Sequence, residues 1–328
     1  MKRKSLGLPL ACILLASLGT AQHGQAQAIN LPANQDFGLT EMACDRTVFG
    51  TRTFPALQHA LNSVRDINHD GEQVVCVRGI ISNDESAGDV PSTLQVENTS
   101  HIILRGISID GEAPLIRKVT TSPVGLDSVL TANNSTLWLE NIRFEHSTVS
   151  PSTTAISINL IRGNVESSNV SISLQSTAPY STALQFRRLQ GGYARFQNLA
   201  VDLMQSPLAT AIVGYGYITA INGLGVQGDG DDQLLVMHGY GGAGIDQLSN
   251  IQAVGLGTGL RFDVSEMTIN ELSHSSIEAV RGSALHLENG ARIRTIDDVE
   301  LTGCEMTVDH WTSLEAVNAL RVRLGGNC

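Results

Sequence analysis

The feature that most constrains the fold is a short motif that recurs along most of the chain. Each copy is a Gly or small polar residue followed by alternating aliphatic residues, as in Asn169-Val170-Ser171-Ile172. A regular period of this kind indicates a repeat architecture, in which each period is one structural unit. The first aliphatic residues of successive copies, which are about 26 residues apart, are Ile107, Ile142, Val170, Leu199, Leu224, Ile251, Ile277 and Val299.

A second strand-like segment precedes most copies, for example Leu234 to Met237 and Leu260 to Val264. Each period therefore contains two or three short strands separated by Gly, Asn or Ser turns. Stacked units of this kind form a parallel β-helix, whose narrow interior suits aliphatic rather than aromatic side chains. The composition agrees, with 32 Gly and only 4% aromatic residues. The sequence predicts an all-β, single-domain solenoid of about eight coils over residues 73–310; a β-sandwich is the alternative, but it does not require a constant period.

Both ends of the predicted solenoid have helix signals, and an open solenoid needs caps to cover its core and strand edges. Thr53 can begin a helix with Pro55 in its first turn. We therefore expect an N-terminal extension and capping helix in residues 29–72, with an apolar face formed by Leu57, Leu61 and Val64. Thr312-Ser313-Leu314-Glu315 fits a capping box. It predicts a C-terminal capping helix in residues 311–328, with an apolar stripe formed by Leu314, Val317, Leu320 and Leu324.

The chain resembles the pectin-lyase-like superfamily of right-handed parallel β-helices. The resemblance rests on the helical segment from Thr53 to Leu61, the strand Val74-Val75-Cys76-Val77-Arg78-Gly79, and the coils that extend to Leu301. It implies right-handed coils. It does not imply one activity, because the superfamily includes lyases, hydrolases, epimerases, adhesins and coils without chemistry.

The first residues have the pattern of a cleavable signal peptide. Lys2, Arg3 and Lys4 precede an apolar run from Leu6 to Leu18, and Ala26-Gln27-Ala28 follows as a small-x-small cleavage site. The run is shorter than the roughly 20 residues of a membrane span, and no later segment is long and apolar enough. Residues 1–28 are therefore predicted to be removed from an exported bacterial protein, in the periplasm, at the cell surface or secreted, without an integral membrane span.

Removal of residues 1–28 changes the net charge from −11 to (21 − 3) − 32 = −14 and leaves Lys118 as the only lysine. This charge argues against nucleic acid as a partner, because binding to phosphates needs basic surface.

Four cysteines remain after residue 28, two near each end of the chain. Four cysteines allow three pairings. The short-loop pairing, Cys44–Cys76 with Cys304–Cys328, is favoured, and it would pin both caps. Metal binding is the weaker interpretation, since the sequence has no C-x-x-C spacing.

The segment from Asp66 to Glu72 matches the opening of a calcium loop. Asp66, Asn68 and Asp70 alternate as oxygen ligands and Gly71 follows, but Val77 stands where the bidentate Glu of an EF-hand would be. A partial calcium site and an ordinary turn therefore both fit this segment, and Ca²⁺ is the only cofactor that the sequence suggests.

A second cluster of polar residues has the composition of a carbohydrate-cleaving site. Gly230-Asp231-Asp232 is similar to the carboxylate pair of pectin-cleaving hydrolases, and His238 follows it. Two carboxylates beside a His can supply a general acid and a base. However, no N-T-D motif precedes the pair, and Met237 stands before His238 where the hydrolase pattern has Gly. A solvated turn explains Asp231 and Asp232 equally well.

With no complete active-site motif, the leading functional hypothesis is a non-catalytic, adhesin-like module that binds a polysaccharide or a cell-surface protein. The alternative is a carbohydrate-active enzyme, a polysaccharide hydrolase or lyase, with Asp231, Asp232 and His238 near its site.

Overall fold

The computed structural model describes residues 44–50, 53–65, 71–97, 101–133, 136–160, 163–188, 192–238, 243–262, 267–308 and 313–325. The predicted signal peptide, residues 1–28, lies outside them.

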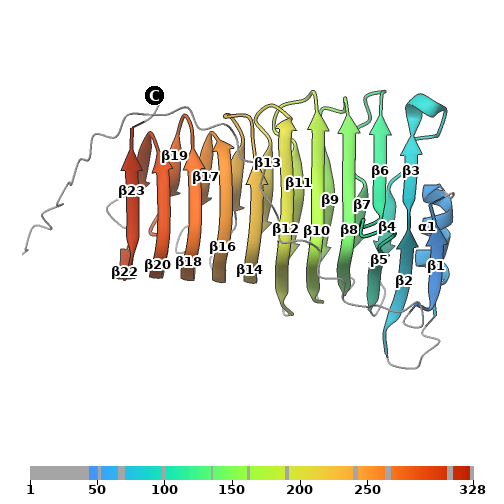
Figure 1. Cartoon of the computed structure of the whole chain (residues 1–328), viewed down its shortest axis with the longest axis horizontal. Helices are drawn as coiled ribbons and strands as arrows, with labels where there is room; N and C mark the ends of the chain where they lie inside the picture. Colours follow the sequence, from blue (N-terminus) through green and yellow to red (C-terminus); the bar gives the residue numbers. More distant parts are fainter. Residues whose placement is uncertain are drawn as a thin grey trace, which may run out of the picture.

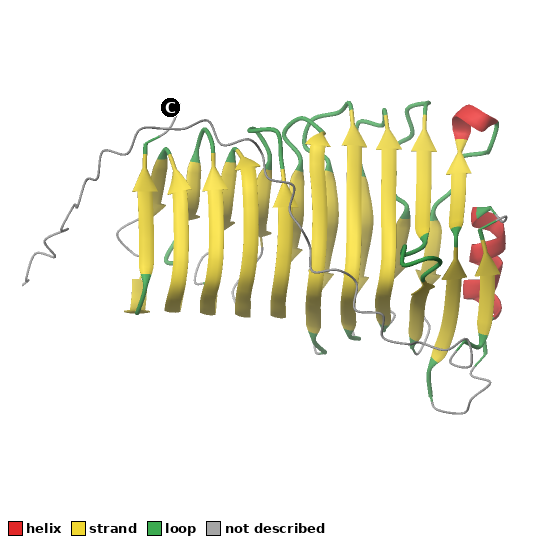
Figure 2. Cartoon of the chain, viewed as in Figure 1, coloured by secondary structure: helices red, strands yellow, loops and turns green. Residues whose placement is uncertain are grey.

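The described chain is almost entirely β-strand, arranged in two long parallel sheets (Figures 1 and 2). The 14-stranded sheet, called the large sheet, contains β1 (Arg46–Phe49), β2 (Gln73–Arg78), β3 (Ile80–Asp84), β5 (Ile102–Ile107), β6 (Leu115–Thr120), β8 (Leu137–Thr148), β10 (Val165–Ser176), β12 (Ala194–Gln205), β14 (Tyr217–Gln227), β16 (Gly244–Leu256), β18 (Thr268–Ala279), β20 (Arg292–Gly303), β22 (Ser313–Val317) and β23 (Leu320–Leu324). The nine-stranded sheet, called the small sheet, contains β4 (Leu94–Glu97), β7 (Leu130–Asn133), β9 (Thr154–Leu160), β11 (Thr182–Arg188), β13 (Thr210–Tyr215), β15 (Gln233–His238), β17 (Thr258–Phe262), β19 (Ser283–Leu287) and β21 (Glu305–Val308). The helical elements are α1 (Phe54–Ser63) and the 3-10 turn η2 (Glu85–Ala87).

The chain alternates between the two sheets, and each strand pairs in parallel with strands one coil away. In the large sheet β10 pairs with β8 and β12, and in the small sheet β11 pairs with β9 and β13. The nine strands of the small sheet correspond to about nine coils. The predicted parallel β-helix is therefore confirmed.

The long strands of the large sheet bend at one residue with a left-handed backbone. These residues occupy equivalent positions in successive coils, and they include Asn141, Asn169, Asn198, Asn250, His274 and Asp298, with φ between 48° and 55°. Asn adopts this conformation more readily than most residues, because its short amide can bond locally. Asn198 Nδ2 also donates to Asn169 Oδ1 of the preceding coil at 3.0 Å.

The register corrects one copy of the repeat. The sequence pattern began this copy at Ser276-Ile277, but Ser276 pairs with Gln252 and Ser275 pairs with Val299. The copy therefore begins at His274. The pattern was misread because a polar residue, Ser275, occupies the inward position that aliphatic residues fill elsewhere.

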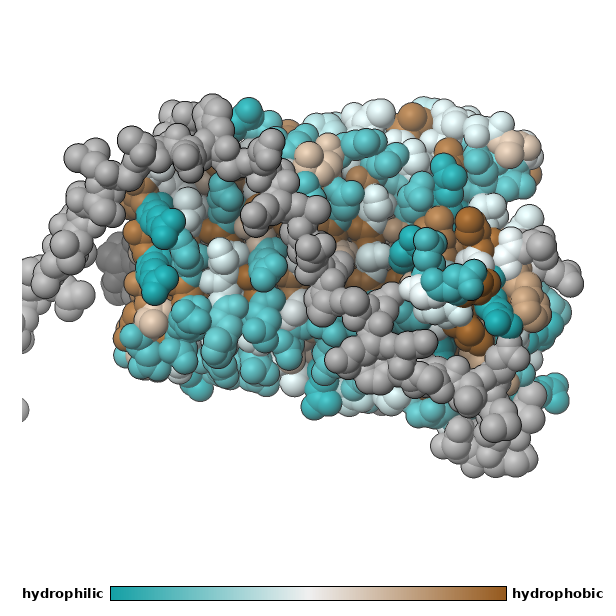
Figure 3. All heavy atoms as spheres, viewed as in Figure 1, coloured by the Kyte–Doolittle hydropathy of each residue, from teal (hydrophilic) through white to brown (hydrophobic). Residues whose placement is uncertain are grey.

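The space inside the coils is filled by one continuous apolar core. Its members are mostly Val, Ile, Leu and Ala, as the composition predicted, and its largest fully buried apolar side chains are Phe54, Phe144, Phe186, Phe196 and Phe262. On the face seen in Figure 3, hydrophilic residues predominate along the lower part of the solenoid, with hydrophobic residues in the band above them.

The predicted N-terminal helix is confirmed as α1, which buries Phe54, Leu57, Ala60 and Leu61 against the first coils. Its Gln58 also covers the free edge of β4. Gln58 Nε2 donates to the Gln95 carbonyl at 2.8 Å, and the Gln95 N–H donates to Gln58 Oε1 at 2.7 Å. The side-chain amide thus replaces the peptide group of a missing strand.

The predicted C-terminal helix in residues 311–328 is wrong for the described part of that segment. Ser313–Val317 and Leu320–Leu324 are strands β22 and β23, and both pair with β20. A helix here would leave the edge of β20 unpaired. Strand pairing satisfies that edge, with Asn318 N donating to the Ile296 carbonyl at 2.9 Å.

The predicted Cys44–Cys76 disulfide is confirmed, with a Cα–Cα distance of 5.7 Å. It ties the segment before β1 to β2, beside the buried Val74 and Ile103. Cys304 is disulfide-bonded. Its predicted partner, Cys328, lies outside the described residues, so that pairing stays a prediction.

Candidate functional site

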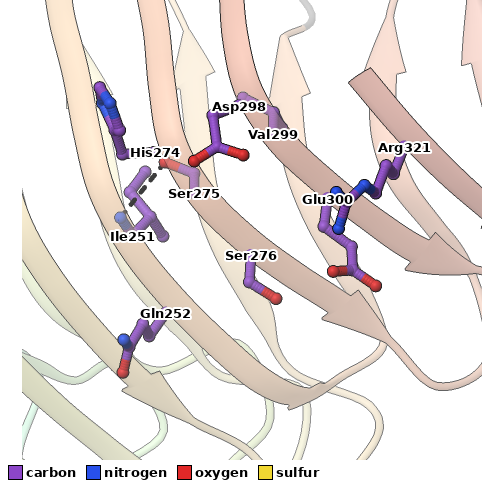
Figure 4. Close-up of a pocket in the computed structure, with 9 residues that line it drawn as sticks. All are labelled: Ile251, Gln252, His274, Ser275, Ser276, Asp298, Val299, Glu300 and Arg321. Carbon is purple, nitrogen blue, oxygen red and sulfur yellow. Dashed lines mark hydrogen bonds between the residues drawn. The ribbon is translucent and has the colours of Figure 1, made fainter. Parts of the chain in front are cut away.

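A shallow groove of about 210 Å³ lies on the large sheet near its C-terminal end (Figure 4). We call it the C-terminal groove. It crosses β16, β18, β20 and β23, and it is lined by Ile251, Gln252, His274, Ser275, Ser276, Asp298, Val299, Glu300 and Arg321.

Two rows of outward side chains form the groove. The first contains His274 and Asp298, the left-handed residues at which β18 and β20 bend. The second contains Gln252, Ser276, Glu300 and Arg321, which are consecutive in the register of β16, β18, β20 and β23. Parallel strands about 4.8 Å apart therefore bring residues from four distant segments together.

Ser275 explains how the floor of the groove is held. Its side chain is buried, and its hydroxyl donates to the Ser273 carbonyl at 2.6 Å. The same oxygen accepts the backbone N–H of Ile251 at 3.2 Å, drawn as a dashed line in Figure 4. The bond to Ser273 lies within β18, and the bond from Ile251 links β16 to β18 directly beneath the groove.

The groove offers hydrogen-bond donors and acceptors without a large excess of one charge. Asp298 is exposed, and Glu300 pairs with Arg323 at 3.1 Å between Oε1 and Nη2. Arg321 adds a guanidinium with several donors, and Gln252 and Ser276 add an amide and a hydroxyl. Such a surface can bind the hydroxyl groups of a ligand, but it is too open to exclude water.

The predicted catalytic residues do not come together. Asp231 is half exposed and pairs with Arg281 at 2.9 Å. Asp232 is fully buried and accepts the backbone N–H groups of Ala209 at 2.8 Å and Asp229 at 3.0 Å. The adjacent carboxylates thus have different environments, one at the surface and one inside a turn.

His238 lies at the other end of β15 from these two acids. At about 3.3 Å per residue, it is roughly 20 Å along the strand from Asp232. Its ring lies beside that of Tyr215, with 5.4 Å between centroids. Tyr215 and His238 continue an outward row of the small sheet that also contains Asn159 and Arg187.

The predicted calcium ligands Asp66, Asn68 and Asp70 lie outside the described residues, so the structure does not test that site. Within the described ranges, no group of three His, Cys, Asp or Glu residues is placed to hold a metal ion. No helix of the described chain has the length and hydrophobicity needed to cross a membrane.

The sequence analysis missed a charged cluster inside the coils, formed by Lys118, Asp127, His146 and Thr148, which we call the buried cluster. Lys118 and His146 are register partners on β6 and β8, and both point inward. Lys118 Nζ lies 2.6 Å from Asp127 Oδ1. Asp127 Oδ2 lies 3.0 Å from His146 Nε2 and accepts the Thr148 hydroxyl at 2.6 Å.

The electrostatics of the buried cluster follow from burial and close contact. Burial alone would raise the pKa of Asp127, but His146, Lys118 and Thr148 outweigh it and hold that pKa below its usual range. Burial lowers the pKa of His146, although Asp127 opposes this effect. A signal was present in the sequence: Lys118 is the only lysine after residue 4, and a lone lysine on an inward position of a strand needs a partner.

Comparison with known proteins gives no match: no protein-family model, curated protein or solved structure matches the chain. The fold and the groove alone therefore define the class, a parallel β-helix protein with a polar groove on one sheet.

Proposed function

We propose that the chain is an exported bacterial binding module, without catalytic activity, that holds a neutral glycan in the C-terminal groove. We also propose that it is a distant member of the pectin-lyase-like superfamily. The observation that carries the binding function is the groove itself, in which charged, amide and hydroxyl side chains from four strands line one shallow surface.

The composition of the groove favours a glycan over a protein partner. Protein interfaces depend on buried aromatic and apolar anchors, and no Phe, Tyr or Trp is among the residues that line the groove. The carboxylate, guanidinium and amide groups that line the groove can donate hydrogen bonds to sugar hydroxyls and accept hydrogen bonds from them. The balance of acidic and basic side chains favours a neutral chain over a polyanion.

The shape of the groove favours binding over catalysis. A site that cleaves glycosidic bonds works best when closure expels water and strengthens its electrostatic interactions. The C-terminal groove is open to water. Asp231, Asp232 and His238 lie outside it, and the described structure does not bring the three side chains together into one site. A hydrolase or lyase is the alternative function.

Binding and cleavage can be tested together on a glycan array, with product analysis of every glycan that binds. The sharpest variant is the double substitution His274→Asn and Asp298→Asn. Asn stands at equivalent positions in Asn169, Asn198 and Asn250, so the left-handed backbone is preserved while the groove loses its imidazole and one of its two carboxylates. We expect binding to weaken about tenfold or more, since each lost hydrogen bond to a charged group costs about 1.5–3 kcal/mol.

The matched control is Glu278→Gln, which removes an exposed charge from β18 outside the groove and should leave binding unchanged. Equal binding by the double variant and the unmodified chain would reject the groove as the site. Shortened products would reject the non-catalytic function and support the enzyme.

A further inference from the structure

The buried cluster places an amine beside a carboxyl group in a region closed to water. Lys118 and Asp127 are 2% and 0% exposed. Keeping two charges in such a place is costly, because the attraction between them only partly replaces their lost hydration. Lys118 lies on β6, and Asp127 lies in the segment that connects β6 to β7.

We propose that Lys118 and Asp127 condense to an intramolecular isopeptide bond, which joins Lys118 Nζ to Asp127 Cγ and releases one water. The bond would fasten the crossing between the large and small sheets, and it would replace a buried ion pair by a neutral amide. This proposal does not depend on the proposed glycan binding.

The contacts of Lys118 place it close to the carboxyl carbon. Because Nζ is 2.6 Å from Asp127 Oδ1 and a C=O bond is about 1.23 Å long, Nζ lies no more than about 3.8 Å from Cγ. A near-attack geometry needs about 3–3.5 Å, so only a small movement of the two side chains is required. Despite this contact, Oδ1 accepts no hydrogen bond of good geometry from the described residues. Nζ instead donates to the Ser128 carbonyl at 2.9 Å and to Thr93 Oγ1 at 3.3 Å. Once Nζ is neutral, its two N–H groups can keep these partners, and its lone pair is then free to face Asp127.

The reaction balances without any additional reactant. Nζ first gives one proton to Oδ1, which converts the ion pair to an amine and a carboxylic acid. The Nζ lone pair then forms a bond to Cγ, and the electron pair of the C=O bond moves onto Oδ2. Nζ gives a second proton to Oδ1, which leaves as water with the electrons of its bond to Cγ. Oδ2 returns its electron pair and becomes the amide carbonyl, and Nζ keeps one hydrogen.

Two side chains are placed to stabilise the negative charge that develops on Oδ2. Thr148 Oγ1 lies 2.6 Å from Oδ2, and His146 Nε2 lies 3.0 Å from it. A neutral His146 with its proton on Nε2 donates to Oδ2 and leaves Nδ1 as a lone pair, which agrees with the absence of any hydrogen-bond partner for Nδ1 in the described structure. The arrangement is that of an oxyanion hole, in which fixed donors meet the charge as it forms.

Mass spectrometry tests the proposal directly. The denatured and reduced full chain should be lighter than its sequence by one water. Trypsin should cut after Arg117 but not after Lys118, and it should release Lys118–Arg143 as one looped peptide lacking a water. Recovery of Val119–Arg143 at its unmodified mass, with no loss of water from the chain, would overturn the proposal.

The control variant is Lys118→Arg, which keeps Asp127 and its neighbour Ser128. Because a cyclic imide at Asp127 also loses one water, the same loss in Lys118→Arg would assign the change to that side reaction and reject the isopeptide bond. Thr148→Val tests the oxyanion hole. We expect it to lower the cross-linked fraction about tenfold or more at a fixed time after refolding, and an unchanged fraction would exclude Thr148 from this role.

Discussion

Asp231 and Asp232 are neighbours in the sequence, but only Asp232 is expected to contribute much to stability. Asp232→Ala would leave the buried N–H group of Ala209 and the partly buried N–H group of Asp229 without their acceptor. Each unsatisfied group costs about 1–3 kcal/mol, so we expect the free energy of unfolding to fall by about 2–4 kcal/mol in urea denaturation. Asp231→Ala is the control, because its exposed pair with Arg281 contributes less than about 1 kcal/mol. Equal losses in both variants would contradict this assignment.

Asp232 should also make the free energy of unfolding depend on pH. Burial raises the pKa of Asp232 to about 6, although the backbone N–H groups of Asp229 and Ala209 oppose the rise. The folded state therefore binds a proton more tightly than the unfolded state, in which the pKa is near 3.8. The contribution of Asp232 to stability should be largest below pH 4 and be lost as the pH rises through 6.

The measurement is urea denaturation between pH 4 and pH 7 for the unmodified chain and for Asp232→Asn, which does not titrate. The difference in unfolding free energy, unmodified minus variant, should fall by about 1–3 kcal/mol across this range. A difference that rises with pH would show that the ionised carboxylate is the form that the fold prefers.

Single residues also mark where sequence reasoning failed. The sequence shows that Asp232 and Lys118 are charged, but it does not show whether each side chain points into the core or toward solvent. That direction depends on the register of the coil. The composition of a turn such as Gly228-Asp229-Gly230-Asp231-Asp232 does not reveal which carboxylate turns inward to accept backbone N–H groups. The catalytic hypothesis for this turn was therefore drawn from residue types without their directions.

At the scale of secondary-structure elements, α1 acts as a substitute strand through Gln58. We expect Gln58→Ala to destabilise the N-terminal end by about 1–2 kcal/mol, because the edge of β4 loses both a donor and an acceptor. The backbone amide of Gln95, whose acceptor is Gln58 Oε1, should exchange its hydrogen faster by about tenfold. His59→Ala, an exposed substitution on the same helix, is the control. Unchanged exchange at Gln95 in Gln58→Ala would show that the helix backbone alone protects this edge.

The two ends of the chain show why helix signals were reliable at one end only. The apolar residues of α1 have no strand partners, so their helical spacing decides the structure. Leu314 and Val317 have the same helical spacing, but they also continue the inward positions of Ile293 and Ile296 in β20. An open sheet edge supplies backbone partners for a strand, and these outweigh a capping box in the sequence.

At the scale of the whole molecule, the period of the sequence was enough to predict the architecture but not the groove. A coil is specified by the alternation of inward aliphatic residues, which repeats along the chain. The groove depends on which outward residues share a register position. The sequence pattern placed the start of one copy at Ser276, two residues after its true start at His274, so it did not predict that His274 lies beside Asp298. His274, Asp298 and Glu300 are therefore assembled by strand pairing, which a periodic pattern gives only approximately.

The asymmetry of the two ends predicts where the solenoid opens first. In a stack of coils, stability is approximately a sum of contacts between neighbours, so terminal coils are the least protected. The N-terminal coil is covered by α1 and tied by Cys44–Cys76. In β22 and β23, by contrast, Val317, Val322 and Leu324 are 47%, 39% and 60% exposed.

We expect amide hydrogens of β22 and β23 to exchange fastest among the described strands, those of β20 next, and those of β10 and β12 slowest. Exchange that begins at β1 and β2 with the disulfide intact would contradict this order. Cys44→Ser removes this disulfide without reducing the bonded Cys304, and it should accelerate exchange in β1 and leave β22 and β23 unchanged.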